Sequence, residues 1–162
     1  MKRSSTVAKP RSGNTQGQQP INFDELPTYV GYVVRRTQAK IFGEFENVLA
    51  DVDFTPGSFG VLTLIRANPG ITQVALAAAF GVDKSTMSPV VVRLEKRGLV
   101  RREVLESDRR CHALYFQPAA EAAFLAARAK VRTFEGALAA RLTKAEQRQL
   151  ALLLWKLQES GA

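Results

Sequence analysis

Residues 71–116 read ITQVALAAAFGVDKSTMSPVVVRLEKRGLVRREVLESDRRCHALYF, and this stretch decides the fold of the chain. Apolar residues at helical spacing predict a first helix over residues 72–80. Gly81 then permits a sharp turn, because a residue without a Cβ adopts backbone angles that other residues resist. Asp83 is suited to cap a second helix, and Gly98 is suited to follow its end in the left-handed conformation.

A basic hairpin is predicted after the second helix, which spans residues 84–97. Two extended runs, residues 99–105 and 111–116, flank a polar tip at residues 106–110. Helix, tight turn, helix and hairpin form the layout of a winged helix-turn-helix. The predicted fold class is therefore mainly α, with a small β wing (α+β).

Within the second helix, the sequence predicts which side faces the core. Val91 and Leu94 are three residues apart and are expected to point inward. Pro89 lies just beyond the first turn, so we expect a mild bend there and no break in the helix.

Basic and small polar side chains gather on this predicted unit, and double-stranded DNA is the partner that they favour. Short polar groups at the start of a helix allow close approach to a groove, and arginines at a hairpin tip suit a narrow minor groove. The predicted DNA-binding residues are Lys84, Ser85, Thr86, Ser88, Arg93, Arg102, Arg109 and Arg110. Asp108 is predicted to orient Arg110, because a carboxylate two residues away can hold the guanidinium group.

Taken together, these motifs resemble the MarR family of bacterial transcriptional regulators, over roughly residues 26–160. The matching segments are residues 54–56 with 69–70, GVDKST at 81–86, RLEKRGLV at 93–100 and DRR at 108–110. The resemblance implies that the second helix enters the major groove and that Arg110, partnered by Asp108, enters the minor groove. One departure follows the wing, where YFQPAA at residues 115–120 replaces the Leu-Thr pattern usual in the family.

The ends of the chain are predicted to form a separate layer of helices. The predicted elements are a helix at 23–51 capped by Asp24, a helix begun by Thr55 and Pro56, an Ala-rich helix at 119–142, and a last helix begun by the capping box at 143–146. These terminal helices carry more apolar surface than one small winged unit can cover, so a two-fold homodimer is expected. The predicted organisation is a disordered basic tail at 1–22 and a single domain at 23–162, with the winged helix at 55–117 and dimerisation helices at 24–51 and 118–160.

Composition excludes several other classes of protein. The first 22 residues hold four cations and no acid, which is half of the formal net charge of +8.

No run of apolar residues is long enough for a transmembrane helix, and no apolar segment marks a secretory signal, so a cytoplasmic location without membrane partners is expected. Cys111 and His112 are adjacent, so on a strand they point apart and cannot form a catalytic pair or a metal site. We therefore expect no enzyme activity, no cofactor and no metal.

A small-molecule effector is expected from the family resemblance, since members commonly bind small aromatic molecules between the dimerisation helices and the winged unit. The predicted ligand-binding residues are Tyr29, Tyr32, Arg35, Arg36, Phe42, Phe59, Leu62 and Arg66. Tyr32 beside Arg35 and Arg36 resembles regulators of aromatic-acid breakdown, so the favoured effector is an aromatic acid or its CoA thioester, such as one like p-coumaroyl-CoA. The same aromatic residues also fit an ordinary core, and the arginines a solvated surface.

Two alternative functions remain compatible with the sequence. A sequence-tolerant architectural protein would coat DNA without any effector. A redox regulator would use Cys111, whose thiol pKa the neighbouring arginines could lower.

Overall fold

The computed structural model describes residues 20–105 and 108–159, and at residues 105 and 108–111 it describes the backbone but not the side chains. The tail predicted to be disordered, residues 1–22, therefore lies almost entirely outside the described residues. The chain divides into two compact units, Met1–Gly43 and Glu44–Ala162, and the division falls inside the first long helix.

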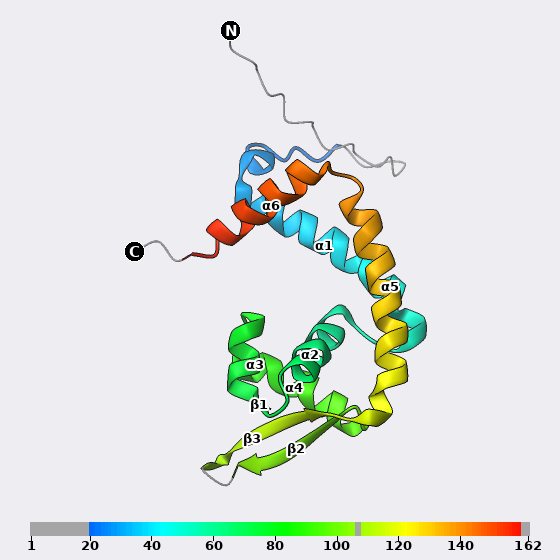
Figure 1. Cartoon of the computed structure of the whole chain (residues 1–162). Helices are drawn as coiled ribbons and strands as arrows, with labels where there is room; N and C mark the ends of the chain where they lie inside the picture. The colour runs from blue at the N-terminus through cyan, green and yellow to red at the C-terminus, as the bar shows by residue number, and fades with distance from the viewer. Residues whose placement is uncertain (1–19, 106–107, 160–162) are drawn as a thin grey trace. The chain divides into compact units, whose positions relative to one another are not determined.

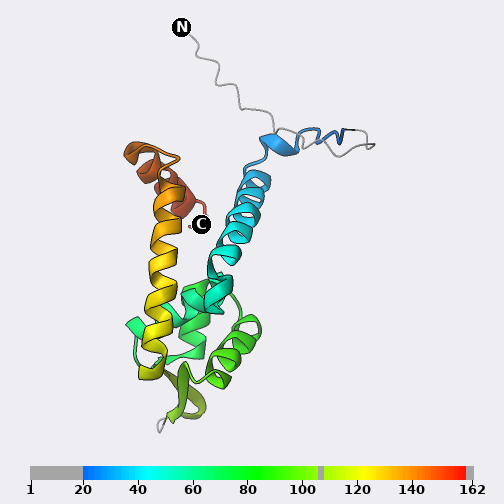
Figure 2. The same cartoon turned by 90° about the vertical axis from the view of Figure 1, so that its right-hand side faces the viewer.

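The second unit consists of helices and a small sheet (Figure 1). The elements in order are η1 (Leu26–Thr28), α1 (Val30–Leu49), η2 (Ala50–Val52), α2 (Pro56–Ala67), β1 (Ile71–Thr72), α3 (Gln73–Phe80), α4 (Lys84–Lys96), β2 (Val100–Leu105), β3 (Asp108–Phe116), η3 (Pro118–Ala120), α5 (Glu121–Ala139) and α6 (Lys144–Lys156). The three strands form one antiparallel sheet in the order β1-β3-β2, so the wing is a β2–β3 hairpin extended by β1. Strands β2 and β3 lie below α2, α3 and α4 in Figure 1. Figure 2 shows α5 leaving the foot of the wing as one long helix. This is the predicted winged helix-turn-helix.

The helix-turn-helix begins and ends at the residues that the sequence singles out. Gly81 follows α3 in the left-handed conformation, with φ of 69°. Asp83 then accepts a hydrogen bond from the Thr86 amide at 2.7 Å and caps α4. Gly98 follows α4 with φ of 69°, which lets the chain turn directly into β2. All three predictions are confirmed.

One side of α4 is buried against α2 and α3. Met87, Val91 and Leu94 all lie in the core, which confirms the inward orientation predicted for two of them. Pro89 lies inside α4 without ending it, as expected. Other elements contribute the rest of this core, including Leu49, Phe54, Val61, Leu62, Ile65, Leu76, Leu114 and Phe124. Burial of these apolar side chains is the main stabilising term of the second unit.

The first unit starts differently from the predicted continuous helix at residues 23–51. Asp24 has φ of 47° and no helix begins at it, so the prediction that Asp24 is a helix cap is wrong. Instead η1 precedes α1, and Tyr29 separates them in an extended conformation. Pro27 explains the interruption, because its ring restricts Leu26 and it has no amide to continue an α-helical ladder.

The wing strands extend closer to the tip than predicted. Strand β3 begins at Asp108, whereas the prediction began it at Cys111 and placed residues 106–110 in the tip. Ladder pairing uses backbone groups, so a polar run continues a strand when its partner is in register. An irregularity between Val104 and Leu105 adjusts that register near the tip. Thr72, the second residue of β1, was predicted as the start of a helix, because so short a strand shows no alternation.

The C-terminal helices differ from prediction only at their boundaries. Helix α5 begins at Glu121 after η3 and ends at Ala139, inside the predicted range of 119–142. The Gln147 side chain donates to the Ala139 carbonyl at 2.6 Å, which satisfies an acceptor at the end of α5. Thr143 begins α6 through the predicted capping box, since its amide donates to the Glu146 carboxylate at 2.8 Å.

Large apolar side chains remain uncovered on both predicted dimerisation segments. On α6 and its C-cap residue Leu157, the exposed residues are Leu150, Leu152, Leu153, Leu154, Trp155 and Leu157. On the part of α1 in the first unit they are Val30, Val33, Val34 and Phe42. Trp155 is 66% exposed and Leu152 is 71% exposed, which is costly for helices facing only water. Such surfaces fit the dimerisation helices of the predicted fold.

Two other features concern possible membrane spans and metal sites. Among the described residues, no single helix is long and apolar enough to cross a membrane, and only the bent pair Val30–Val52 with Pro56–Ala67 reaches that length and composition together. Helix α2 of this pair is a core helix, with Val61, Leu62 and Ile65 buried. The described residues contain no cluster of His, Cys, Asp and Glu suited to a metal ion.

Leu62 tests the contribution of the core. Leu62 is fully buried on α2, so Leu62→Ala is expected to lower the free energy of unfolding by about 2–5 kcal/mol, measured by urea denaturation. Val74→Ala is the matched control, because Val74 is exposed on α3 and its truncation is expected to cost about 0.5 kcal/mol or less. Equal losses in the two variants would contradict this packing.

Candidate nucleic-acid interface

The first turn of α4 presents a set of exposed polar groups. Lys84, Ser85 and Thr86 are exposed and Ser88 is partly exposed, so four predicted DNA-binding residues lie together. Asp83 organises this turn, because the Ser85 hydroxyl donates to its carboxylate at 2.6 Å. That hydrogen bond, followed by those from the amide and hydroxyl of Thr86, holds the pKa of Asp83 below its usual range. The turn therefore offers small, fixed polar groups to a groove.

Basic side chains continue along the outward side of α4. Arg93 and Lys96 are exposed in the last turn of the helix. They lie opposite the stripe of Met87, Val91 and Leu94 that enters the core. A helix that is anchored on one side and carries cations on the other is suited to the electronegative groove of DNA.

The arginines at the base of the wing form ion pairs with acidic residues of the same chain. Arg102 Nη2 lies 3.2 Å from a carboxylate oxygen of Glu95 on α4, and its side chain is only 23% exposed. The Nε and Nη2 atoms of Arg102 are shielded from solvent and make no aligned hydrogen bond, so this contact is an ion pair only. Arg101 pairs with Glu103 and lies over the Tyr115 ring at 5.0 Å. The structure thus turns Arg102 toward α4, and its predicted contact with DNA stays a prediction.

Residues at the tip of the wing are described by their backbone alone. Asp108, Arg109, Arg110 and Cys111 all belong to β3. Their side chains lie outside the described part of the structure, so the predicted Asp108–Arg110 contact and the reactivity of Cys111 stay predictions.

In the first unit, the predicted ligand-binding residues contact their own segment. The Tyr29 hydroxyl donates to Glu25 at 2.8 Å, and this hydrogen bond raises the pKa of Tyr29. Arg36 donates to the Tyr32 hydroxyl at 3.3 Å and lies over the rings of Tyr32 and Phe23, with centroid distances of 5.8 and 5.7 Å. Arg35 and Phe42 are exposed.

In the second unit, the predicted ligand-binding residues are tightly packed. Phe59 stacks on Phe124 with ring centroids 5.5 Å apart, and Leu62 is fully buried. Arg66 donates to both carboxylate oxygens of Glu121, at 3.1 and 2.7 Å, and lies over the Phe124 ring at 5.2 Å. These contacts fit the alternative that the sequence left open, in which such residues serve packing, and their binding role stays a prediction.

Comparison with known proteins identifies the family to which this chain belongs. The MarR family pattern matches residues 54–112. The protein assigned as transcriptional regulator of the hcr operon in Thauera aromatica is 36% identical over 129 residues, which cover 79% of this chain and 78% of that relative. This chain belongs to the MarR family. Its relatives are transcriptional regulators, and the chain is accordingly a regulator and not an enzyme.

Solved structures of the MarR-family repressor CouR share this fold. CouR bound to a 23-mer DNA duplex aligns with a TM-score of 0.79 and 31% identity, over 87% of this chain and 100% of that chain. CouR bound to p-coumaroyl-CoA aligns with a TM-score of 0.79 and 28% identity, over 88% of this chain and 100% of that chain.

Three of the acids that hold arginines in this MarR protein were not predicted from the sequence. Glu95, Glu103 and Glu121 each pair with an arginine, and none was singled out. Arg101 and Glu103 are two apart on one strand and so share a face, which was a usable signal. Arg66 and Glu121 are 55 positions apart, so no local pattern predicts their contact.

The Glu121 pairing predicts a dependence of stability on acid pH. The hydrogen bonds from Arg66 lower the pKa of Glu121, so the pair stabilises the fold above the unfolded-state pKa and this contribution is lost as pH falls through the folded-state pKa. We expect Glu121→Gln to lower the thermal midpoint near neutral pH, and the difference from wild type to vanish between about pH 5 and pH 3. Glu135→Gln, an exposed change on the same helix, is the control. A difference that stays constant over this range would show that the carboxylate charge is not involved.

Proposed function

We propose that this protein is a homodimeric transcriptional repressor that binds a pseudo-palindromic DNA operator and is released by an aromatic acid or its CoA thioester. It would act on DNA in the cytoplasm, and it would need no cofactor. The observation that carries the proposal is the first turn of α4, where Lys84, Ser85 and Thr86 are exposed beside the Asp83 cap.

The proposed DNA contacts follow from the exposed side of α4. Its first turn would meet base edges in the major groove, while Arg93 would neutralise a phosphate. The wing would bring Arg110 to the adjacent minor groove, as the family resemblance implies. CouR, solved bound to a 23-mer DNA duplex and 31% identical to this chain, supports DNA as the partner.

A dimer would place two copies of α4 on one side of the DNA. The uncovered apolar side chains of α6, such as Leu153 and Trp155, would be buried by a second copy of the chain. Two-fold symmetry then predicts half-sites about one helical turn, or ~34 Å, apart.

The proposed effector class rests on the relatives and on the arginines of α1. CouR has been solved with p-coumaroyl-CoA, and its 28% identity over 88% of this chain supports a similar ligand class. Arg35 and Arg36 would meet the phosphates of a CoA group, since guanidinium forks bind phosphate well. Arg66 is already held by Glu121 and would contribute less. The ligand would act by favouring a dimer geometry in which the two α4 helices no longer match adjacent grooves.

The salt dependence of DNA binding tests the assignment of the arginines. Arg93→Gln removes an exposed cation from α4 and is expected to weaken binding and to flatten the plot of log K against log salt by about one. Arg102→Gln is the matched control, because its guanidinium faces Glu95 and its loss is expected to leave that slope unchanged. Fluorescence anisotropy of a labelled duplex at several salt concentrations measures both. A flattened slope for Arg102→Gln would instead support the phosphate contact predicted from sequence.

The effector class is tested by competition against DNA. We expect p-coumaroyl-CoA to release the protein from a duplex taken from upstream of its own gene, with p-coumarate, CoA alone and a random duplex as controls. Arg35→Gln is expected to weaken the response to the thioester by about fivefold or more while DNA affinity is retained, since one charge-assisted contact is lost. Release by the free acid alone would restrict the effector to small aromatic acids. Equal, unresponsive binding to both duplexes would favour the architectural alternative.

A further inference from the structure

We propose that Arg97 is a positioning residue for DNA specificity. This inference rests on the proposed function. Arg97 ties the end of the recognition helix α4 to the junction between α1 and α2, and it acts through the pose of α4 rather than by touching DNA. The junction consists of residues 50–55.

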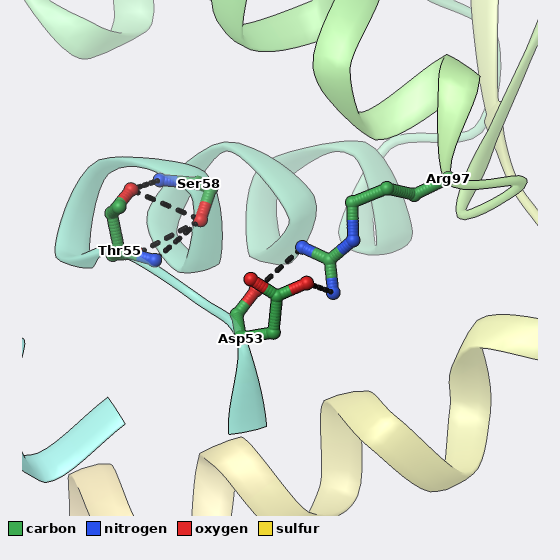
Figure 3. A network of polar contacts seen from close by, with 4 residues as sticks. All are labelled: Asp53, Thr55, Ser58 and Arg97. Carbon is green, nitrogen blue, oxygen red and sulfur yellow. Dashed lines mark hydrogen bonds and ion pairs between the residues drawn. The ribbon is translucent and has the colours of Figure 1, made fainter. Parts of the chain in front are cut away.

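Arg97 occupies the point where α4 turns into the wing. It is the C-cap of α4, and Gly98 and β2 follow it directly. Its side chain reaches across to Asp53, 44 positions earlier in the chain (Figure 3). The Nη1 atom donates to the Asp53 carbonyl oxygen at 2.5 Å, and Nη2 lies 3.1 Å from the Asp53 carboxylate. The same guanidinium lies over the ring of buried Phe54 at 5.0 Å, so three contacts set its orientation.

The junction itself is a turn that leads into the capped start of α2. Asp53 has φ of 53°, in the left-handed region, where residues other than glycine are uncommon but Asp is enriched. The next residues begin α2, where the Thr55 amide donates to the Ser58 hydroxyl at 2.8 Å and the Ser58 amide donates to Thr55 Oγ1 at 3.1 Å. Arg97 therefore binds a carbonyl whose direction is already set on both sides.

The same junction is also tied to α5. Lys130 Nζ lies 2.8 Å from the carboxylate of Asp51, two residues before Asp53. Leu49, at the end of α1, is fully buried in the core beside this junction. The end of α1, the middle of α5 and the end of α4 are thus joined by two ion pairs on one short segment. A displacement of α5 or of the end of α1 would reach α4 through Arg97.

The geometry disfavours a direct phosphate contact for Arg97. Its guanidinium already has two acceptors on Asp53, and its side chain is 26% exposed. Lys96, the preceding residue, is exposed and has no such partner assigned in the described part of the chain, so it is the better candidate for a phosphate. Lysine at position 97 would keep the charge but would lose the planar fork and the stacking on Phe54.

The test measures specificity, not affinity alone. The tightest duplex selected from a random library and an unselected random duplex are each titrated with full-length protein over a range of salt, at a temperature where melting shows every variant folded. Both Arg97→Lys and Arg97→Gln are expected to weaken binding to the selected duplex about tenfold, with the random duplex and both salt slopes unchanged. Lys96→Gln is the matched control, with equal losses on both duplexes and a slope flattened by about one. Asp53→Asn is expected to add little to Arg97→Gln, because the two changes remove one shared interaction.

Four results would overturn the inference. Equal losses on both duplexes with a flattened slope would make Arg97 a phosphate contact. Unchanged affinities with only a lower melting temperature would limit it to stability. A wild-type protein with no preference between the duplexes would overturn the proposed function as well, whereas a preference that survives both Arg97 variants overturns this inference alone.

Discussion

Burial of one apolar stripe on α4 is the constraint on which the proposed interface depends. A helix of this length is marginal by itself in water, so its stability comes from Met87, Val91 and Leu94 in the core. The helical period places these three side chains on one face, against α2 and α3. The opposite face is then necessarily outward, and the residues there are polar or basic. The same packing that stabilises the helix therefore presents its functional side.

Acidic residues decide which cations remain available for DNA. A formal net charge of +8 suggests a broadly basic surface, but Arg66, Arg97, Arg101 and Arg102 each pair with an acid. Partly exposed ion pairs such as these contribute a small amount to stability, and they also orient the arginine side chains. Arg93 remains exposed on α4, and the wing and the first turn of α4 supply the other candidates. Only some of the basic side chains of the chain are therefore candidates to face DNA.

The junction after α1 connects α4, which carries the proposed interface, to α5. Asp51 and Asp53 lie on one short segment and bind α5 and the end of α4 respectively. Coupling between an effector that changes the dimer and the DNA interface would need an element whose arrangement both sites bias. The contacts that would form such an element here are two ion pairs, one backbone carbonyl and an arginine stacked on Phe54.

The amino-acid sequence by itself determined the helix-turn-helix, the wing and the start of α6. Their signals are local, since Asp83, Gly81, Gly98 and the Thr143 capping box act within four residues of themselves. Local signals failed where a competing residue intervened, as Pro27 did for the predicted cap at Asp24, and where a strand was too short to show alternation, as β1 was. Only the tertiary structure decided which arginines are held and which are presented. Arg66–Glu121 and Arg97–Asp53 join residues 55 and 44 positions apart, and such contacts exist only after the core has brought distant segments together.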